Sequence, residues 1–234
     1  MQFGLRLPGR TIGTVAIEGA VAVLASGGVD SAILVAHLVN QGREVTPIYV
    51  RFGLAWEDTE ARHLERFLAS LTAPRANPLV VLDLPIADVY GTHWSVTGQG
   101  VPDETSSDEA VYLPGRNLLL LAKSTVWCAL NGVPTIALGT LAANPFPDAD
   151  SEFFDGLSAL VGRALGCPLE VVTPFAGRKK REVLDIGREF ALDLTFSCIA
   201  PRSDRHCGRC NKCAERRLAF SELGIADTTV YATT

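Results

Sequence analysis

The sequence of 234 residues has few aromatic residues (7%) although 47% of it is hydrophobic, so a largely aliphatic core is expected. No apolar run approaches the roughly 20 residues that a membrane-spanning helix needs. Residues 1–20 contain no apolar stretch typical of a secretion signal. Neither sign of charge dominates, since 21 Lys and Arg face 26 Asp and Glu, and the net charge of -5 does not favour binding to nucleic acid or anionic membranes. These absences predict a cytoplasmic, soluble protein.

Two common phosphate-binding motifs are also missing. No Gly-Lys dipeptide occurs, which excludes a Walker loop, and no G-x-G-x-x-G opens a helix. A different glycine-rich segment, Ser26-Gly27-Gly28-Val29-Asp30-Ser31, lies between an apolar run and a segment of helical character. Two glycines let the backbone approach a ligand closely, and a helix N-terminus presents free N–H groups to an anion. The hexapeptide predicts a nucleotide phosphate site in which Asp30 helps to hold Mg²⁺; a serine N-cap after a glycine turn would explain Ser31 alone.

Short apolar runs alternate with segments of helical character along most of the chain. Strands are expected at 20–25, 45–50, 79–84, 135–138 and 170–172, and helices at 31–39, 61–71, 116–131, 152–165 and 180–190. This alternation predicts an α/β fold, a Rossmann-like parallel sheet sandwiched by helices. Residues 85–113 break the alternation with three glycines and an acidic, serine-rich stretch. We interpret them as a long loop near the active site that orders on binding.

Four of the six cysteines are clustered: Cys198, Cys207, Cys210 and Cys213. In a reducing compartment such a cluster predicts a metal site rather than disulfides. Four thiolates leave no coordination position for water, so a structural Zn²⁺ is expected, with an iron–sulfur cluster as the rival. His206 is either a substitute ligand or a solvated neighbour. The isolated Cys128 and Cys167 are expected to pack in the core.

The segment around the cysteine cluster is rich in basic residues: Arg202, Arg205, Arg209, Lys212, Arg216 and Arg217. A solvated surface is the simpler interpretation, and an RNA-facing patch is the alternative. The cluster predicts a small C-terminal knob. We therefore divide the chain into a nucleotide-binding domain at 1–195 and a zinc-binding region at 196–234.

The glycine-rich hexapeptide resembles the pyrophosphate loop of the PP-loop ATP pyrophosphatases. Together with the cysteines, it makes the chain similar to the 7-cyano-7-deazaguanine synthase (QueC) family from about residue 20 to the C-terminus. Three further segments carry this resemblance: Tyr112–Asn117, Thr173–Phe175 followed by Lys180 and Glu182, and Thr195–Cys198. The resemblance implies an adenine nucleotide alpha hydrolase-like fold and a homodimer. The net charge and the lack of long apolar runs argue against nucleic acid or a membrane as partner.

The resemblance also implies an activity. ATP would adenylate the carboxylate of 7-carboxy-7-deazaguanine, ammonia would displace AMP to give the amide, and a second adenylation would lead to the nitrile, 7-cyano-7-deazaguanine (preQ0), in queuosine biosynthesis. The implied catalytic residues are Ser26, Asp30, Ser31 and Lys180. ATP would contact Leu24, Ala25, Ser26, Gly27, Gly28, Val29, Asp30 and Ser31. The substrate would contact Arg116, Asn117, Asp148 and Glu152. Two simpler interpretations stay open: Lys180 is one cation of the surface run 178–181, and Arg116 and Asn117 merely begin a helix.

The chain departs from the family pattern in two places. Residues 52–54 read Phe-Gly-Leu where relatives carry Tyr-Gly-Gln, and residues 146–150 read Phe-Pro-Asp-Ala-Asp where they carry Tyr-Pro-Asp-Cys-Arg. Adenylation is therefore implied more firmly than the substrate. One alternative is a paralogue that stops at the amide or joins a deazaguanine carboxylate to another amine. Others are a PP-loop tRNA-modifying enzyme and a nucleotide-sensing module that docks a partner.

Overall fold

The computed structural model describes residues 19–72, 76–142 and 144–232. At its centre lies a sheet of five parallel strands in the order β3-β2-β1-β4-β5. The strands are β1 (Val21–Leu24), β2 (Val45–Arg51), β3 (Val80–Asp83), β4 (Thr135–Ala137) and β5 (Glu170–Val172). All five coincide with the short apolar runs that predict strands in the sequence.

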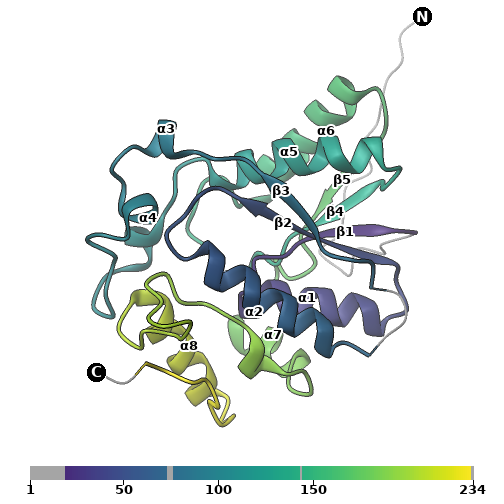
Figure 1. Cartoon of the computed structure of the whole chain (residues 1–234). Coiled ribbons are helices and arrows are strands. Elements are labelled where there is room, and N and C mark those ends of the chain that lie inside the picture. Colours follow the sequence, from purple (N-terminus) through teal and green to yellow (C-terminus); the bar gives the residue numbers. More distant parts are fainter. Residues whose placement is uncertain (1–18, 73–75, 143, 233–234) are drawn as a thin grey trace, which may run out of the picture.

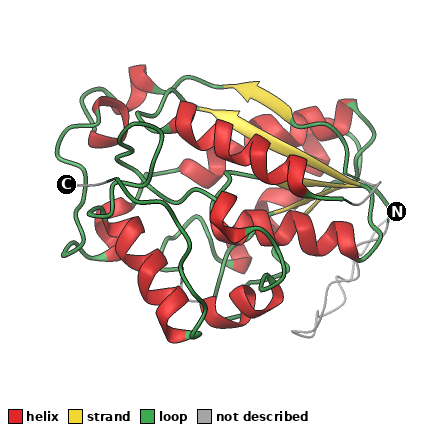
Figure 2. Ribbon diagram, turned by 60° about the horizontal axis from the view of Figure 1, so that its bottom comes forward, coloured by secondary structure: helices red, strands yellow, loops and turns green. Residues whose placement is uncertain are grey.

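Helices cover both faces of this sheet (Figure 1 and Figure 2). One face carries α1 (Val29–Asn40), α2 (Glu57–Ser70) and α7 (Lys180–Ile186), and the other carries α5 (Arg116–Leu130) and α6 (Ser151–Leu165). Alternate residues of β1 belong to the cores on opposite faces of the sheet: Val21 and Val23 pack with α1, whereas Ala22 and Leu24 pack with α5 and α6. A parallel sheet buried on both faces confirms the predicted fold class.

The strand order creates a switch point beside β1. β2 pairs with one edge of β1 and β4 with the other, so the connections that follow β1 and β4 lead away from each other. In open α/β sheets, ligands bind in the crevice at such a point, outside the carboxyl ends of the strands. The glycine-rich hexapeptide directly follows β1 and therefore lies at this crevice.

Residues 85–113 are more ordered than the predicted loop. They contain two short helices, α3 (Ala87–Tyr90) and α4 (Trp94–Thr97), and a 3₁₀ turn, η1 (Asp108–Val111). Trp94 stacks on Trp56 with ring centroids 5.7 Å apart. The Asn211 backbone N–H donates to the Pro102 carbonyl, which ties the segment to the cysteine-bearing region. Elements of four residues are too short to show a periodic pattern, so they could not be predicted from the sequence.

After α7 the chain forms a 3₁₀ turn, η2 (Leu192–Leu194), and a helix that was not predicted, α8 (Asn211–Glu222). α8 packs against α7, and its Ala219 and Phe220 join the core that contains α1. The Phe196 backbone N–H donates to the Gly27 carbonyl at 2.7 Å. The cysteine-bearing region thus shares a core with the sheet, and the boundary at residues 195 and 196 stays a prediction. No helix within the described ranges is long and apolar enough to cross a membrane.

Candidate active site and metal centre

The hexapeptide forms a hydrogen-bonded loop before α1. The Ser26 N–H donates to Ser31 Oγ at 3.2 Å, and the Gly28 N–H donates to Ser26 Oγ at 3.3 Å. Ser31 Oγ in turn donates to the Gly28 carbonyl at 3.1 Å. No side chain caps α1 at Gly28 within the described residues, so its first-turn N–H groups remain available to an anion. The loop is therefore preorganised to bind a phosphate.

Glycine is required at two close approaches around this loop. Gly27 has a φ of +82°, and a Cβ there would lie 3.1 Å from Leu64 Cβ and 3.3 Å from the Glu60 carbonyl. Gly139, in the connection after β4, would place a Cβ 3.2 Å from the backbone of Asp30. Both contacts bring backbone against backbone at the start of α1, where only glycine fits without displacement.

Four charged side chains form a chain from α1 to α8. Lys180 Nζ lies 2.7 Å from Asp30 Oδ2 and 3.3 Å from Glu215 Oε1, and Lys212 Nζ lies 2.7 Å from Glu215 Oε2. Burial lowers the pKa of Lys180, but the attraction of Asp30 and Glu215 outweighs it, so the pKa lies above 10.5. Burial raises the pKa of Glu215, but Lys180 and Lys212 overcome this effect and hold it at about 2. Lys180 and Glu215 are therefore both charged near neutral pH.

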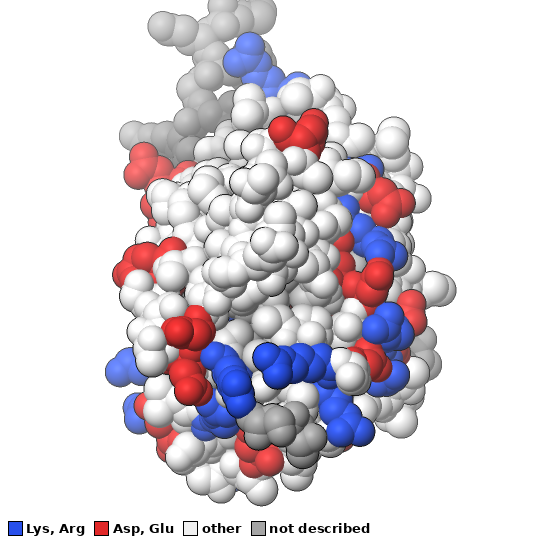
Figure 3. Space-filling view, turned by 60° about the vertical axis from the view of Figure 1, so that its left-hand side comes forward, with Lys and Arg blue, Asp and Glu red and all other residues white. Residues whose placement is uncertain are grey.

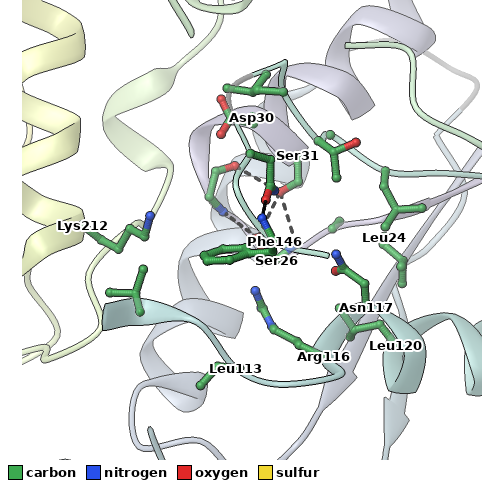
Figure 4. Close-up of a pocket in the computed structure, with 18 of the residues that line it drawn as sticks. Leu24, Ser26, Asp30, Ser31, Leu113, Arg116, Asn117, Leu120, Phe146 and Lys212 are labelled. Carbon is green, nitrogen blue, oxygen red and sulfur yellow. Dashed lines mark hydrogen bonds between the residues drawn. The ribbon is translucent and has the colours of Figure 1, made fainter. Parts of the chain in front are cut away.

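These charges face a cavity of about 460 Å³, and a second cavity of about 230 Å³ adjoins it through shared lining residues that include Ser26, Glu60 and Arg116. Figure 4 shows Arg116 and Asn117 directed from the start of α5 toward the loop, with the Lys212 side chain pointing into the same space. Asp30 Oδ1 is buried without a hydrogen-bond partner, which leaves one carboxylate oxygen to meet a cation. The donor set fits a magnesium-bound nucleotide.

Part of the lining of the larger cavity is apolar and aromatic. Tyr112 and Phe146 stack there with ring centroids 4.8 Å apart and an interplanar angle of 24°. Phe52, Leu54 and Leu120 also line this cavity. Flat apolar walls suit a planar heterocycle, so the cavity combines groups for a phosphate with walls for a ring.

Most of the predicted site residues meet at these cavities. The larger one is lined by Leu24, Ala25, Ser26, Gly28, Asp30, Ser31, Arg116, Asn117, Asp148 and Lys180, and the smaller one also by Val29. Gly27 lines neither cavity, because its backbone is turned to the Phe196 N–H. Glu152 is exposed on α6 and also lines neither cavity. Lys180 is thus more than one cation of a surface run, because its amine is paired inside the site.

Asp148 fixes the start of α5. Its Oδ2 accepts the Asn117 backbone N–H at 2.9 Å, and its carbonyl accepts the Asn117 side-chain amide at 2.9 Å. The preceding Gly115 has no side chain to cap the helix, so Asp148 supplies the capping oxygen from a distant segment. Asp150 is itself the N-cap of α6 and accepts the Phe153 N–H at 2.7 Å. Arg116 Nε, in contrast, is buried without a partner and stays free to meet a ligand.

A buried carboxyl that sequence reasoning missed lies beside Arg116. Glu60 is only 9% exposed, and Tyr49 donates to its Oε2 at 2.8 Å. Burial raises the pKa of Glu60 to about 7, while Arg116 and hydrogen bonds from Tyr49 and Trp56 limit the rise. Glu60 precedes the buried Leu64 by four residues and Phe67 by seven, which places a charged residue on the core face of α2. That position was the available sequence signal.

The four clustered cysteines could hold a single metal ion. All four side chains are buried, and their sulfur atoms lie within 4.8 Å of one another. The Cys207–Cys213 and Cys198–Cys210 sulfur pairs are 3.9 and 3.8 Å apart. A tetrahedral ion with metal–sulfur bonds of about 2.3 Å requires sulfur pairs about 3.8 Å apart. The Cys207 backbone N–H donates to Cys198 Sγ at 3.2 Å, and such donors stabilise thiolates.

Two residues near the cluster differ from their predicted surroundings. His206 is neither a ligand nor solvated: it is 1% exposed, and its Nε2 accepts the Ser197 N–H at 3.1 Å. Arg216 is 2% exposed rather than part of a solvated surface, and it donates to the Leu192 carbonyl and Thr195 Oγ1. Arg216 therefore holds η2 against α8.

The two isolated cysteines differ in burial. Cys128 is buried as predicted, whereas Cys167 is half-buried.

The remaining basic residues of this region do not form a uniformly basic surface. Figure 3 shows Lys and Arg side chains gathered on the lower part of one face, interleaved with acidic ones. Asp204 of this region pairs with Arg62 and Arg66 of α2, and Arg217 pairs with Glu104. Because cations and carboxylates are mixed, this face offers less attraction to a phosphate backbone than the basic residue count alone implies.

Comparisons with known proteins agree with the motifs. The family model for queuosine biosynthesis protein QueC matches residues 20–224. A 7-cyano-7-deazaguanine synthase of Koribacter versatilis is 30% identical over 226 residues, covering 92% of this chain and 94% of the relative. One of Methanothermobacter thermautotrophicus is 30% identical over 226 residues, covering 91% and 98%. A third, of Sulfolobus acidocaldarius, is 29% identical, and the chain spans about half of that relative's length (47%).

Solved structures resemble the chain more distantly. A predicted subunit of tRNA methyltransferase from Methanocaldococcus jannaschii has a TM-score of 0.48 and 17% identity, covering 74% of this chain and 76% of that one. A likeness at this level carries no argument about activity. The match over residues 20–224, and the 30% identity to relatives that the chain covers almost completely, show that it belongs to the QueC family of queuosine biosynthesis proteins.

Proposed function

We propose that this chain is an ATP-dependent carbon–nitrogen ligase that adenylates the carboxylate of 7-carboxy-7-deazaguanine and uses ammonia to form 7-cyano-7-deazaguanine through the amide. One observation carries the proposal: the loop 26–31, Lys180 and Arg116 converge on one cavity that the stacked Tyr112 and Phe146 also line. Membership of the QueC family, whose matched relatives are named 7-cyano-7-deazaguanine synthases, supports the same reaction.

Each group has a task in this reaction. ATP supplies the adenylyl group that turns a carboxylate into an electrophile. The loop N–H groups and Lys180 stabilise the negative charge that develops on the departing pyrophosphate, and Asp30 holds the accompanying Mg²⁺. Arg116, whose buried Nε has no hydrogen-bond partner, binds the substrate carboxylate beside Asn117. The Tyr112–Phe146 pair stacks on the heterocycle.

Incubation with ATP, Mg²⁺, ammonia and 7-carboxy-7-deazaguanine tests the proposal. AMP and pyrophosphate should appear, and mass spectrometry should detect the amide followed by the nitrile. Release of ADP, or no turnover by protein that contains its metal, would contradict it. The expected homodimer stays a prediction, which sedimentation analysis tests.

A second candidate keeps the adenylation and changes the acceptor, so that the chain joins the carboxylate to another amine or stops at the amide. The observation that favours it is that Phe52, Leu54 and Phe146, three positions at which the family pattern is altered, line the larger cavity. Because apolar side chains stand there in place of Tyr and Gln, the lining of the cavity differs from the family pattern. A screen of primary amines separates the candidates, because a conjugate of higher mass than the nitrile would favour the second.

We propose Zn²⁺ as the ion of the four-cysteine site. One ion fits four sulfurs this close together, whereas a four-iron cluster places its cysteines on separate irons and needs them farther apart. Elemental analysis of the purified protein should find one zinc per chain and no acid-labile sulfide.

A further inference from the structure

Glu60 is a buried carboxyl at the junction of the two cavities. It lines both of them, as do Ser26 of the phosphate-binding loop and Arg116 at the start of α5. The proposed function places the departing pyrophosphate at the loop and the substrate carboxylate at Arg116. Glu60 therefore lies beside the region where the acyl carbon would react, and the smaller cavity of about 230 Å³ has room for a small nucleophile.

The groups that face Glu60 leave it able to gain and lose a proton. Tyr49 on β2 donates to its Oε2 at 2.8 Å, and the Trp56 side chain adds a hydrogen bond. Arg116 attracts the charged form and Glu57 repels it, while burial has the largest effect and raises the pKa to about 7. A carboxyl whose pKa lies near the working pH suits general base catalysis.

The other carboxyls of the cavities are engaged or exposed: Asp30, Glu57, Asp108, Asp148, Glu215 and Glu222. Asp30 and Glu215 form ion pairs with Lys180. Asp148 accepts the Asn117 N–H, and Glu57 accepts the Phe52 and Gly53 N–H groups. Asp108 and Glu222 are exposed at the rim. Among the described lining residues, Glu60 is thus the buried carboxyl without an ion pair or a backbone donor.

Attack on an adenylated carboxylate creates a proton that must be removed. When ammonia or an amine adds to the acyl carbon, its nitrogen becomes positively charged. It would leave again faster than AMP unless it lost a proton. We propose that Glu60 accepts this proton from the attacking nitrogen, so that the carbon–nitrogen bond is kept and the carbon–oxygen bond to AMP breaks. AMP departs with the electron pair of that bond, and Glu60 returns the proton to solvent. This inference rests on the proposed function.

Two partial reactions measured on Glu60→Gln test the inference. Substrate-dependent exchange of pyrophosphate into ATP reports adenylation, and this rate should stay within about threefold of the unmodified protein. Ammonia-dependent amide formation should fall by about 10²–10⁴-fold, the usual contribution of a general base. Hydroxylamine, which is largely unprotonated near neutral pH and traps acyl adenylates without a base, should give product with a much smaller loss.

Glu65→Gln is the matched control, because Glu65 is an exposed residue of the same helix. It should leave both reactions unchanged, and circular dichroism should show that both variants are folded. Amide formation by Glu60→Gln within threefold of the unmodified protein would overturn the inference. Equal losses in exchange and amide formation would also overturn it, since they would assign Glu60 to adenylation. Absence of exchange in the unmodified protein would instead contradict the proposed function itself.

Discussion

Lys180 Nζ lies 2.7 Å from Asp30 Oδ2, although the two residues are 150 positions apart in the chain. Asp30 is in the first turn of α1, beside the free N–H groups of the phosphate-binding loop, and Lys180 begins α7. The ion pair therefore holds a cation at the end of the helix where the proposed function places the phosphates. It also places that cation where charge would develop on the departing pyrophosphate.

Replacement of this cation should slow adenylation more than it weakens folding. We expect Lys180→Met to reduce substrate-dependent pyrophosphate exchange by about 10²-fold or more, because a preorganised cation at developing charge is worth that much. Arg181→Met, on the exposed surface of the same helix, should retain exchange and controls for the loss of one positive charge. Equal rates in the two variants would show that Lys180 has only a structural role.

The phosphate-binding loop should be sensitive to a single methyl group at Gly27. Gly27→Ala would combine a strained φ of +82° with contacts to Leu64 and the Glu60 carbonyl, and we expect it to lower the free energy of unfolding by at least about 2 kcal/mol. Gly53 has a similar φ of +80° but open space around its missing Cβ. Gly53→Ala should therefore cost only about 1 kcal/mol. Urea unfolding of both variants measures the difference, and equal losses would show that crowding at Gly27 is unimportant.

The sequence predicts the sheet and the loop because both are recorded in contiguous residues. Five apolar runs mark the strands, and residues 26–31 predict a phosphate site without reference to any other segment of the chain. α8 is not predictable in this way, since its buried face includes Asn211, Cys213 and Arg216 and therefore shows no apolar stripe. Its burial depends on hydrogen bonds to η2 that only the folded chain brings together.

In the site, too, contacts between distant segments could not be predicted from the sequence. The charge chain that links Lys180, Glu215 and Lys212 joins two helices and cannot be read from either helix alone. Glu60 and Tyr49 likewise come from a helix and a strand. The sequence does place Glu60 on the core face of α2, at the spacing of Leu64. A charged residue in such a position is a more useful indication of function than the exposed Glu152 of the family pattern.

The pH dependence of stability gives a second readout for Glu60 that does not involve activity. A carboxyl whose folded pKa is raised destabilises the fold as pH rises from its unfolded value near 4.5 to the folded value of about 7. Glu60→Gln cannot ionise, so its stability relative to the unmodified protein should increase across this interval, by up to about 3 kcal/mol. Urea unfolding at steps between pH 5 and pH 8 measures this change. A constant difference across that range would show that the Glu60 pKa is not raised.

Removal of the metal should weaken nucleotide binding as well as the C-terminal region. Cys210 immediately precedes α8 and Cys213 lies in its first turn, on either side of Lys212. Without the ion, this turn loses its anchor, and Lys212 and Glu215 no longer hold their places against Lys180. We expect Cys210→Ser to lose the metal, to lose helical signal in circular dichroism, and to bind ATP at least tenfold more weakly. Cys167→Ser, outside the cluster, should keep both the metal and the affinity. Unchanged ATP affinity in a metal-free variant would show that the cysteine cluster and the nucleotide site are independent.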